Sequence, residues 1–146
     1  MNDVTLPLAG IDYPPPIRVL VVDDEPSVRT FAERVLRDAG YAVDTASNGA
    51  EALNIVKNEG LFHLFVIDEL MPGMRGHELA QKLRQRQADA KVLYYTGYPD
   101  LLLQDKRQFD ENEAVIAKPV SVEGLREAVS RLLFDVPSGP RTDGSR

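Results

Sequence analysis

The sequence predicts an α/β protein in which a parallel β-sheet carries helices on both faces. Five short apolar runs alternate along the chain with five longer segments whose apolar residues recur at helical spacing. This alternation favours a parallel sheet, because parallel strands are joined by crossover connections and helices are the usual ones. A chain of 146 residues with 43% hydrophobic residues has room for one such domain and can bury a core.

The first half of the domain is predicted to contain two strands and two helices. IRVLVV (17–22) and YAVDTA (41–46) have the length and β-branched content of strands. A helix is expected from Pro26, because proline suits the first helical turn and apolar residues follow at helical spacing. Asn48 and Glu51 match an N-cap and its reciprocal partner, so the second helix is expected to begin there.

The second half contains three further pairs of strand and helix by the same criteria. The strands are predicted at LFHLFVI (61–67), KVLYYT (91–96) and EAVIAK (113–118). The helices are predicted from Gly76 to about Gln87, from Pro99 to about Arg107, and from the N-cap Ser121 through Leu132. The predicted sheet therefore has five strands, each followed by a helix.

Two flanking segments fall outside the predicted domain. Residues 1–16 end in three prolines and are interpreted as a Pro-rich leader or linker. Residues 135–146 are rich in Pro, Gly, Ser and charge, which predicts a flexible tail. The folded domain is therefore expected at residues 17–134.

Composition excludes several classes of protein. A formal net charge of -6 argues against nucleic acid as a partner, because a nucleic-acid binder needs a basic surface. The absence of cysteine excludes disulfides, thiolate metal sites and cysteine nucleophiles. Neither a secretory signal nor an apolar stretch of transmembrane length is present, so we expect a soluble cytoplasmic protein without a membrane partner.

Polar residues finish four of the five predicted strands. They are Asp23-Asp24-Glu25 after the first, Asp68-Glu69 after the third, Thr96 at the end of the fourth and Lys118 at the end of the fifth. The carboxyl ends of parallel strands meet at one edge, where ligands bind. Carboxylates brought together there repel each other unless positive charge lies among them. Lys118 supplies one such charge, and a hard divalent cation held by oxygen atoms would supply the rest.

Four motifs at these strand ends resemble the response-regulator receiver domains of two-component signalling. They are VLVVDDEP (19–26), VIDELMPGM (66–74), YYTG (94–97) and AKP (117–119). Each motif is common by itself, whereas four in this order are specific. The resemblance covers residues 17–134 and implies the flavodoxin-like, doubly wound fold, with the five strands in the order 2-1-3-4-5.

The resemblance implies a magnesium site at this edge. Asp23 and Asp24 would hold Mg²⁺ together with Asp68. Asp24 would be the more direct ligand, and Asp23 would act mainly through water. The backbone carbonyl of Glu69 would be a further ligand. These assignments suit Mg²⁺, which takes one or two carboxylates directly and keeps several waters.

The resemblance also implies a covalent role for Asp68, which would be the phosphoacceptor that forms an aspartyl-phosphate. Thr96 would hydrogen-bond a phosphoryl oxygen, and Lys118 would pair with the phosphoryl group. The Lys118-Pro119 peptide bond is expected to be cis, as is usual in the family.

A protein of this family would be a signalling switch rather than an enzyme, catalysing only its own phosphorylation and dephosphorylation. A histidine kinase or a histidine phosphotransfer protein would be its phosphodonor. The face of the fourth helix, fifth strand and last helix would bind a downstream protein, and a homodimer through that face is a further expectation. The chain would be a stand-alone receiver or the receiver of a hybrid kinase.

Other interpretations remain open. An Mg²⁺-dependent phosphohydrolase would also use an aspartyl-phosphate, but such enzymes place a second aspartate two residues later, where this chain has Leu70. A degenerate receiver that only docks partners is a third possibility. Asp24, taken alone, is suited to capping the helix that begins at Pro26. Val115 stands where many receivers have an aromatic residue, so the usual coupling of phosphorylation to that residue is in doubt.

The two histidines are not assigned a phosphoryl-carrying role. His63 is predicted to lie inside the buried third strand, and His77 at the start of the third helix. A histidine in either setting is more often structural or solvated than functional.

Overall fold

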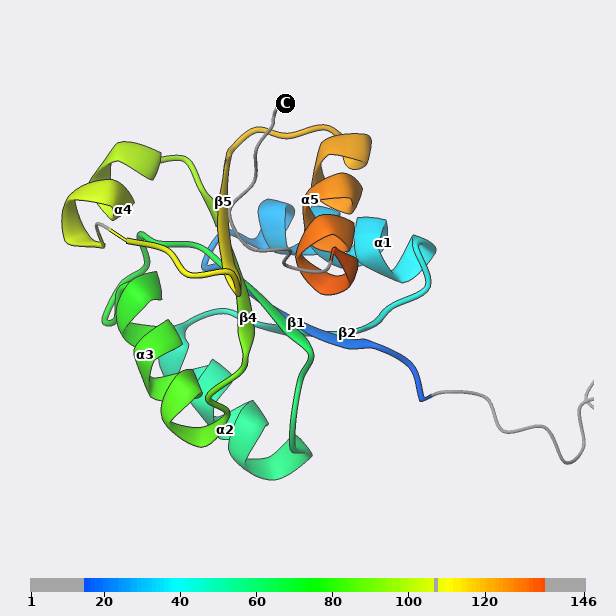
Figure 1. Ribbon diagram of the computed structural model, residues 1–146, viewed down its shortest axis with the longest axis horizontal. Coiled ribbons are helices and arrows are strands. Elements are labelled where there is room, and N and C mark those ends of the chain that lie inside the picture. Colours follow the sequence, from blue (N-terminus) through cyan, green and yellow to red (C-terminus); the bar gives the residue numbers. More distant parts are fainter. Residues whose placement is uncertain (1–14, 107, 136–146) are drawn as a thin grey trace, which may run out of the picture.

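The computed structural model describes residues 15–106 and 108–135, so the predictions for most of the leader and for the tail beyond residue 135 lie outside the described residues. Strands and helices alternate throughout (Figure 1). In chain order they are β1 (Arg18–Val22), α1 (Pro26–Asp38), β2 (Ala42–Ala46), α2 (Gly49–Glu59), β3 (Leu64–Ile67), α3 (Gly76–Arg86), β4 (Lys91–Thr96), α4 (Pro99–Asp105), β5 (Glu113–Ala117) and α5 (Val122–Phe134).

The five strands form one parallel sheet in the order β2-β1-β3-β4-β5. This confirms the predicted fold class and strand order. The chain crosses from β2 on one side of β1 to β3 on the other. In open α/β sheets, ligands bind at such a switch in strand order, outside the carboxyl ends of the strands.

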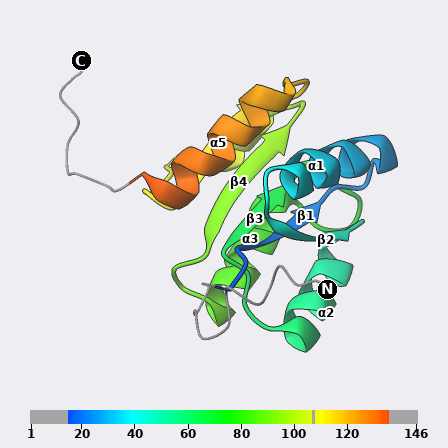
Figure 2. The same ribbon diagram turned by 90° about the vertical axis from the view of Figure 1, so that its right-hand side faces the viewer.

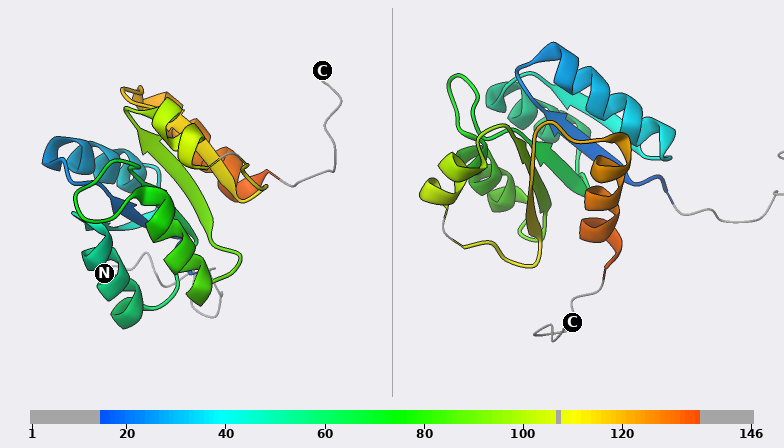
Figure 3. Two further views of the ribbon diagram at one scale, coloured as in Figure 1. Left: turned by 90° about the vertical axis from the view of Figure 1, so that its left-hand side faces the viewer. Right: turned by 90° about the horizontal axis from the view of Figure 1, so that it is seen from above.

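Helices cover both faces of the sheet. Helices α1 and α5 lie on one face, and α2 and α3 lie on the other (Figures 1 and 2). Helix α4 belongs to the second layer and contacts the edge strand β5 (Figure 3). Among the residues that the structure describes, no helix is long and apolar enough to cross a membrane.

The helical layers explain the uniform hydrophobicity of the central strand β3. Leu64 and Val66 pack into the core under α1 and α5, whereas Phe65 and Ile67 pack into the core under α2 and α3. A strand covered on both faces needs apolar side chains at every position rather than at alternate ones.

The third strand is shorter than predicted, because it begins at Leu64 rather than at residue 61. Its pairing with β1 starts where Leu64 lies opposite Val19. Leu61 is 65% exposed, and His63 is exposed, with its Nδ1 accepting the Arg18 N–H at 2.9 Å. The prediction that His63 lies inside a buried strand is therefore wrong, because the apolar run extends beyond the region of strand pairing.

The helix caps follow the sequence closely. The Asn48 side chain accepts the Glu51 N–H at 2.8 Å, as predicted, while the Glu51 carboxylate accepts the N–H of Ser47 rather than that of Asn48. The Ser121 side chain caps α5 through the Gly124 N–H at 2.9 Å. At α1 the N-cap residue is Glu25, not Asp24. The capping interpretation of Asp24 is thereby excluded.

Candidate functional site

Three charged side chains meet at the carboxyl end of the sheet. The Lys118 Nζ atom lies 2.7 Å from Asp23 Oδ2 and 3.2 Å from Asp68 Oδ2. Asp23 is 2% exposed and Asp68 is 6% exposed, so the two carboxylates share a partly dry environment with one ammonium group. The predicted convergence of these strand ends is confirmed.

The backbone of the sheet fixes the three positions. The Asp23 N–H donates to the Ala46 carbonyl at 3.1 Å, and the Asp68 N–H donates to the Val22 carbonyl at 3.0 Å. The Lys118 N–H likewise donates to the Thr96 backbone carbonyl at 2.8 Å. Each residue thus extends the hydrogen-bonding pattern of the sheet one position beyond its strand. The side chains start from a rigid frame, which favours a reproducible geometry.

Asp24 completes a cluster of three carboxylates. One oxygen atom from each of Asp23, Asp24 and Asp68 lies within 4.8 Å of the others. Asp24 is exposed, whereas both oxygens of Asp23 already accept hydrogen bonds, one from Lys118 and one from the Glu25 N–H at 2.9 Å. A set of clustered carboxylate oxygens with one solvent-accessible member is the donor chemistry that a hard divalent cation requires.

The pKa values of Asp68 and Lys118 are both raised, but for different reasons. Burial raises the pKa of the Asp68 carboxyl above its ordinary value; Lys118 opposes this shift and Asp23 adds to it. For Lys118, burial acts to lower the pKa, but hydrogen bonds and attraction from Asp23 and Asp68 outweigh it and raise the pKa. Lys118 is therefore a firmly charged ammonium, and Asp68 is a carboxylate held at a cost in free energy.

Asp68→Asn is expected to raise the free energy of unfolding at neutral pH when no divalent cation is added. Because the folded state raises the Asp68 pKa, the stabilisation associated with this group is fully present below its unfolded pKa and is lost as the pH rises through the folded pKa. The asparagine side chain does not ionise, so the variant does not lose this stabilisation as the pH rises. Urea titrations at pH 7 and at acid pH check this: the variant should gain stability at pH 7 and lose the advantage below the ordinary carboxyl pKa. Equal stability of both proteins at both pH values would contradict it.

Thr96 and Lys118 define the other side of the cluster. Thr96 is 0% exposed, and its Oγ1 accepts the Tyr98 N–H at 3.0 Å, which leaves the hydroxyl hydrogen available as a donor. The Lys118 ammonium also lies 5.5 Å from the centre of the Tyr95 ring. The Lys118-Pro119 peptide bond is cis, as expected.

Glu69 contacts the start of α3 through both its backbone and its side chain. Its backbone carbonyl accepts the Gly76 N–H at 2.9 Å at the start of α3, and the carbonyl oxygen keeps a second lone pair. Its side chain is completely buried, with one oxygen 2.8 Å from the His77 N–H and the other 2.6 Å from His77 Nδ1. The sequence carried no signal for this pair beyond its position at a helix start.

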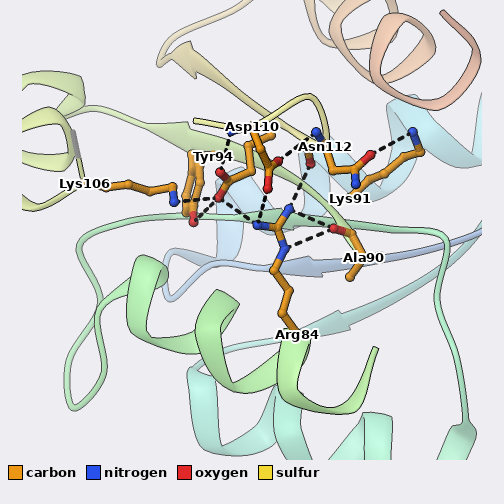
Figure 4. A network of polar contacts seen from close by, with 8 residues as sticks. Arg84, Ala90, Lys91, Tyr94, Lys106, Asp110 and Asn112 are labelled. Atoms are coloured by element: carbon orange, nitrogen blue, oxygen red, sulfur yellow. Dashed lines mark hydrogen bonds and ion pairs between the residues drawn. The ribbon is translucent and has the colours of Figure 1, made fainter. Parts of the chain in front are cut away.

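A further buried carboxylate, that of Glu113, lies on β5, the strand that α4 contacts. The Glu113 side chain is 2% exposed and accepts from Lys106 Nζ at 3.0 Å and Arg84 Nη1 at 3.3 Å (Figure 4). The Tyr94 hydroxyl donates to it at 3.4 Å, and burial together with the Glu113 charge raises the Tyr94 pKa, so the phenol stays protonated. This network joins α3, the end of α4 and β5, and sequence reasoning missed it.

Comparison with known proteins places the chain in a family. The family model for the response regulator receiver domain matches residues 19–130. The chain is 30% identical over 117 residues to the response regulator receiver protein CpdR of Brucella abortus, covering 80% of this chain and 97% of that protein. It is 34% identical over 116 residues to the sensor kinase CckA of the same organism, covering 79% of this chain but only 12% of the kinase.

Solved structures agree with this assignment. The chemotaxis protein CheY4 of Vibrio cholerae superimposes with a TM-score of 0.73 at 30% identity, covering 82% of this chain and all of that one. The receiver domain of the hybrid histidine kinase CckA gives a TM-score of 0.68 at 34% identity, with 80% of this chain and 98% of that one covered. The chain therefore belongs to the response regulator receiver domain family of two-component signalling.

Proposed function

We propose that this chain is a phosphorylation-controlled switch that accepts a phosphoryl group on Asp68. The observation that carries the proposal is the position of the Lys118 ammonium between Asp23 and Asp68. It supplies fixed positive charge beside a buried nucleophile. Attack by an anion on an anionic phosphoryl group depends mostly on positioning and charge neutralisation, so this arrangement fits the reaction.

In the proposed reaction, an Asp68 carboxylate oxygen bonds to phosphorus while the bond from phosphorus to the donor's histidine nitrogen breaks. Carboxylates are among the side chains that enzymes use as covalent nucleophiles. Lys118 pairs with the negative charge on the phosphoryl oxygens, and Thr96 donates its hydroxyl hydrogen to one of them. The Tyr98 N–H donates a hydrogen bond to the Thr96 Oγ1 at 3.0 Å, and this bond orients the hydroxyl.

We assign the metal-binding role to Asp24 and Asp68, with Asp23 acting through water. Three observations support this: the three carboxylates are clustered, Asp24 is exposed, and both oxygens of Asp23 are engaged by the protein. Bound Mg²⁺ would supply additional positive charge at the phosphoryl oxygens. Lys118 cannot offset three carboxylates alone, which makes a dependence on the metal reasonable.

The phosphodonor would be a histidine kinase or a histidine phosphotransfer protein, in the cytoplasm. The match to a small part of the sensor kinase CckA and to nearly the full length of CpdR supports both a hybrid-kinase and a stand-alone context. A downstream protein would bind the face of α4, β5 and α5, where Tyr98 is 57% exposed and Leu103 is 48% exposed. The same face would serve a homodimer.

The second candidate function is an Mg²⁺-dependent phosphohydrolase with the same aspartyl-phosphate. Leu70, 38% exposed, occupies the position where such an enzyme would need its second aspartate. An aliphatic side chain cannot act as the general acid, so sustained turnover is disfavoured.

Incubation with a small-molecule phosphodonor and Mg²⁺, followed by intact-mass measurement and mapping of the modified residue, tests the proposal. One phosphoryl group on Asp68 is expected, absent from Asp68→Asn and after chelation of the metal. Asp89→Asn is the matched control, since Asp89 is an exposed aspartate remote from the site in sequence, and it should be phosphorylated like the wild type. Modification of another residue, or steady release of many equivalents of phosphate, would refute the switch.

A further inference from the structure

A second cluster of potential ligands lies beside the phosphoacceptor. One side-chain atom from each of Glu69, His77 and Asp105 lies within 4.8 Å of the others. Glu69 directly follows Asp68, His77 is in the first turn of α3, and Asp105 is the last residue of α4. The cluster therefore joins the loop that carries the phosphoacceptor to a helix on the proposed partner face.

The positive charge in this cluster is supplied by Arg75. Its Nη1 atom lies 3.2 Å from Asp105 Oδ2 and 3.8 Å from Glu69 Oε2. Its backbone is fixed at the start of α3, where the Arg75 N–H donates to the Glu78 carboxylate at 2.8 Å. A guanidinium group that bridges two carboxylates takes the place of a metal ion, so we do not assign a metal to this cluster.

Helix α4 depends on such contacts at its carboxyl end. It spans only seven residues, and Leu102 is its one buried residue. The pair of Arg75 with Asp105 and the pair of Lys106 with Glu113 at 3.0 Å hold its end to α3 and β5. On β5, the partly buried Val115 packs against the core cluster that contains Leu102. Valine has no aromatic ring whose rotation could carry a change at Asp68 to α4.

We infer that Arg75 is a positioning residue that couples the phosphoacceptor loop to α4. The inference rests on the proposed function, because it concerns how phosphorylation of Asp68 changes the partner face. A phosphoryl group adds negative charge to the residue that precedes Glu69. Arg75 is then drawn toward the loop and its contact with Asp105 weakens, so the end of α4 opens.

Hydrogen exchange of the α4 amides in the full chain tests the tether before any phosphorylation. Arg75→Ala and Asp105→Asn should each speed exchange at the end of α4 by about two- to fivefold, the range set by a partly exposed ion pair. Because Arg75→Ala already removes the pair with Asp105, the double variant should exchange no faster than Arg75→Ala alone. High salt should speed α4 exchange more in the wild type than in Arg75→Ala, because the Lys106–Glu113 pair that remains in the variant is more buried and less screened.

Arg131→Ala is the matched control. Arg131 forms an exposed ion pair with Glu127 within α5, at 2.7 Å, and its loss should leave α4 exchange unaltered. The tether is refuted if Arg75→Ala changes α4 exchange no more than Arg131→Ala does. A smaller salt dependence in Arg75→Ala than in the wild type is the result that a merely steric role of Arg75 would not produce.

The same measurement on the phosphorylated proteins tests the coupling. Phosphorylation should speed α4 exchange in the wild type and produce no further increase in Arg75→Ala, with adduct formation on Asp68 verified by mass in both. An undiminished increase in Arg75→Ala overturns the coupling. If the wild type forms no adduct, the proposed function fails and the coupling with it, whereas the unphosphorylated measurements still decide whether Arg75 holds α4.

Discussion

Arg84→Met is expected to lower the free energy of unfolding by about 3 kcal/mol, the scale for removing one partner from a buried ion pair. The Arg84 side chain is only 19% exposed, and Glu113 is 2% exposed. Its loss leaves Glu113 with Lys106 as its remaining cation. A buried carboxylate that loses a partner bears the desolvation cost with less attraction to offset it.

Arg84 also donates hydrogen bonds to backbone carbonyl groups, which an apolar side chain cannot do. Its guanidinium donates twice to the Ala90 carbonyl, at 3.2 and 3.0 Å, and once to the Asn112 carbonyl at 3.3 Å (Figure 4). Methionine keeps an aliphatic stem of similar length, so the change isolates the guanidinium group. Arg84→Lys should recover only part of the loss, because an ammonium group cannot make these forked contacts.

Thermal and urea unfolding followed by circular dichroism measure the effect. A loss of about 3 kcal/mol corresponds to a fall in Tm of about 10 °C for a domain of this size. Arg131→Met is the control, because the Arg131 side chain is 70% exposed and its pair with Glu127 lies on the surface. A surface pair of this kind contributes at most about 1 kcal/mol. Equal stability of the two variants would show that the network around Glu113 is not stabilising.

The main site was predictable because two simple rules fix it. Asp23, Asp68 and Lys118 each follow directly on an apolar run, and the carboxyl ends of parallel strands share one edge. The strand order was an implication of the family resemblance, and the structure confirms it. Together these place the three side chains near one another without knowledge of any individual contact.

The remaining contacts depend on packing between helices, for which the sequence has no comparable rule. Glu113 begins an apolar run and gives no sign that Arg84 and Lys106 converge on it. Glu69 was singled out for its carbonyl, yet its buried side chain makes the strong contact, to His77 at 2.6 Å. His63 was misplaced because hydrophobicity marks burial near a strand, whereas the strand itself is defined by pairing.

Gly76→Ala is expected to slow phosphorylation of Asp68 by about a hundredfold, because a displacement near 1 Å at a reacting group has an effect of that order. A Cβ atom at residue 76 would lie 2.9 Å from Glu69 Cα and 3.0 Å from the Asp68 carbonyl carbon, and closer still to the Asp68 carbonyl oxygen. These are backbone atoms of the phosphoacceptor loop. They cannot rotate away as a side chain would, so the loop itself must move.

Two opposing effects decide the stability of this variant. Alanine is favoured over glycine in a helix by about 1 kcal/mol, and residue 76 begins α3. Overpacking against a fixed backbone costs about 1–3 kcal/mol. The clash should prevail, with a net loss of about 1 kcal/mol. The larger effect is on the reaction rate, because movement of the loop changes the 3.2 Å distance between Asp68 Oδ2 and Lys118 Nζ.

Gly97→Ala separates this steric effect from a general effect of alanine at the carboxyl end of the sheet. Gly97 follows Thr96, has no atom within 4 Å of an added Cβ, and is not among the glycines with positive φ. It should therefore retain most of the wild-type rate of adduct formation, measured by intact mass against time with a small-molecule phosphodonor and Mg²⁺. If Gly76→Ala reacted as fast as Gly97→Ala, the close approach of α3 to the phosphoacceptor backbone would have no part in placing Asp68 for reaction.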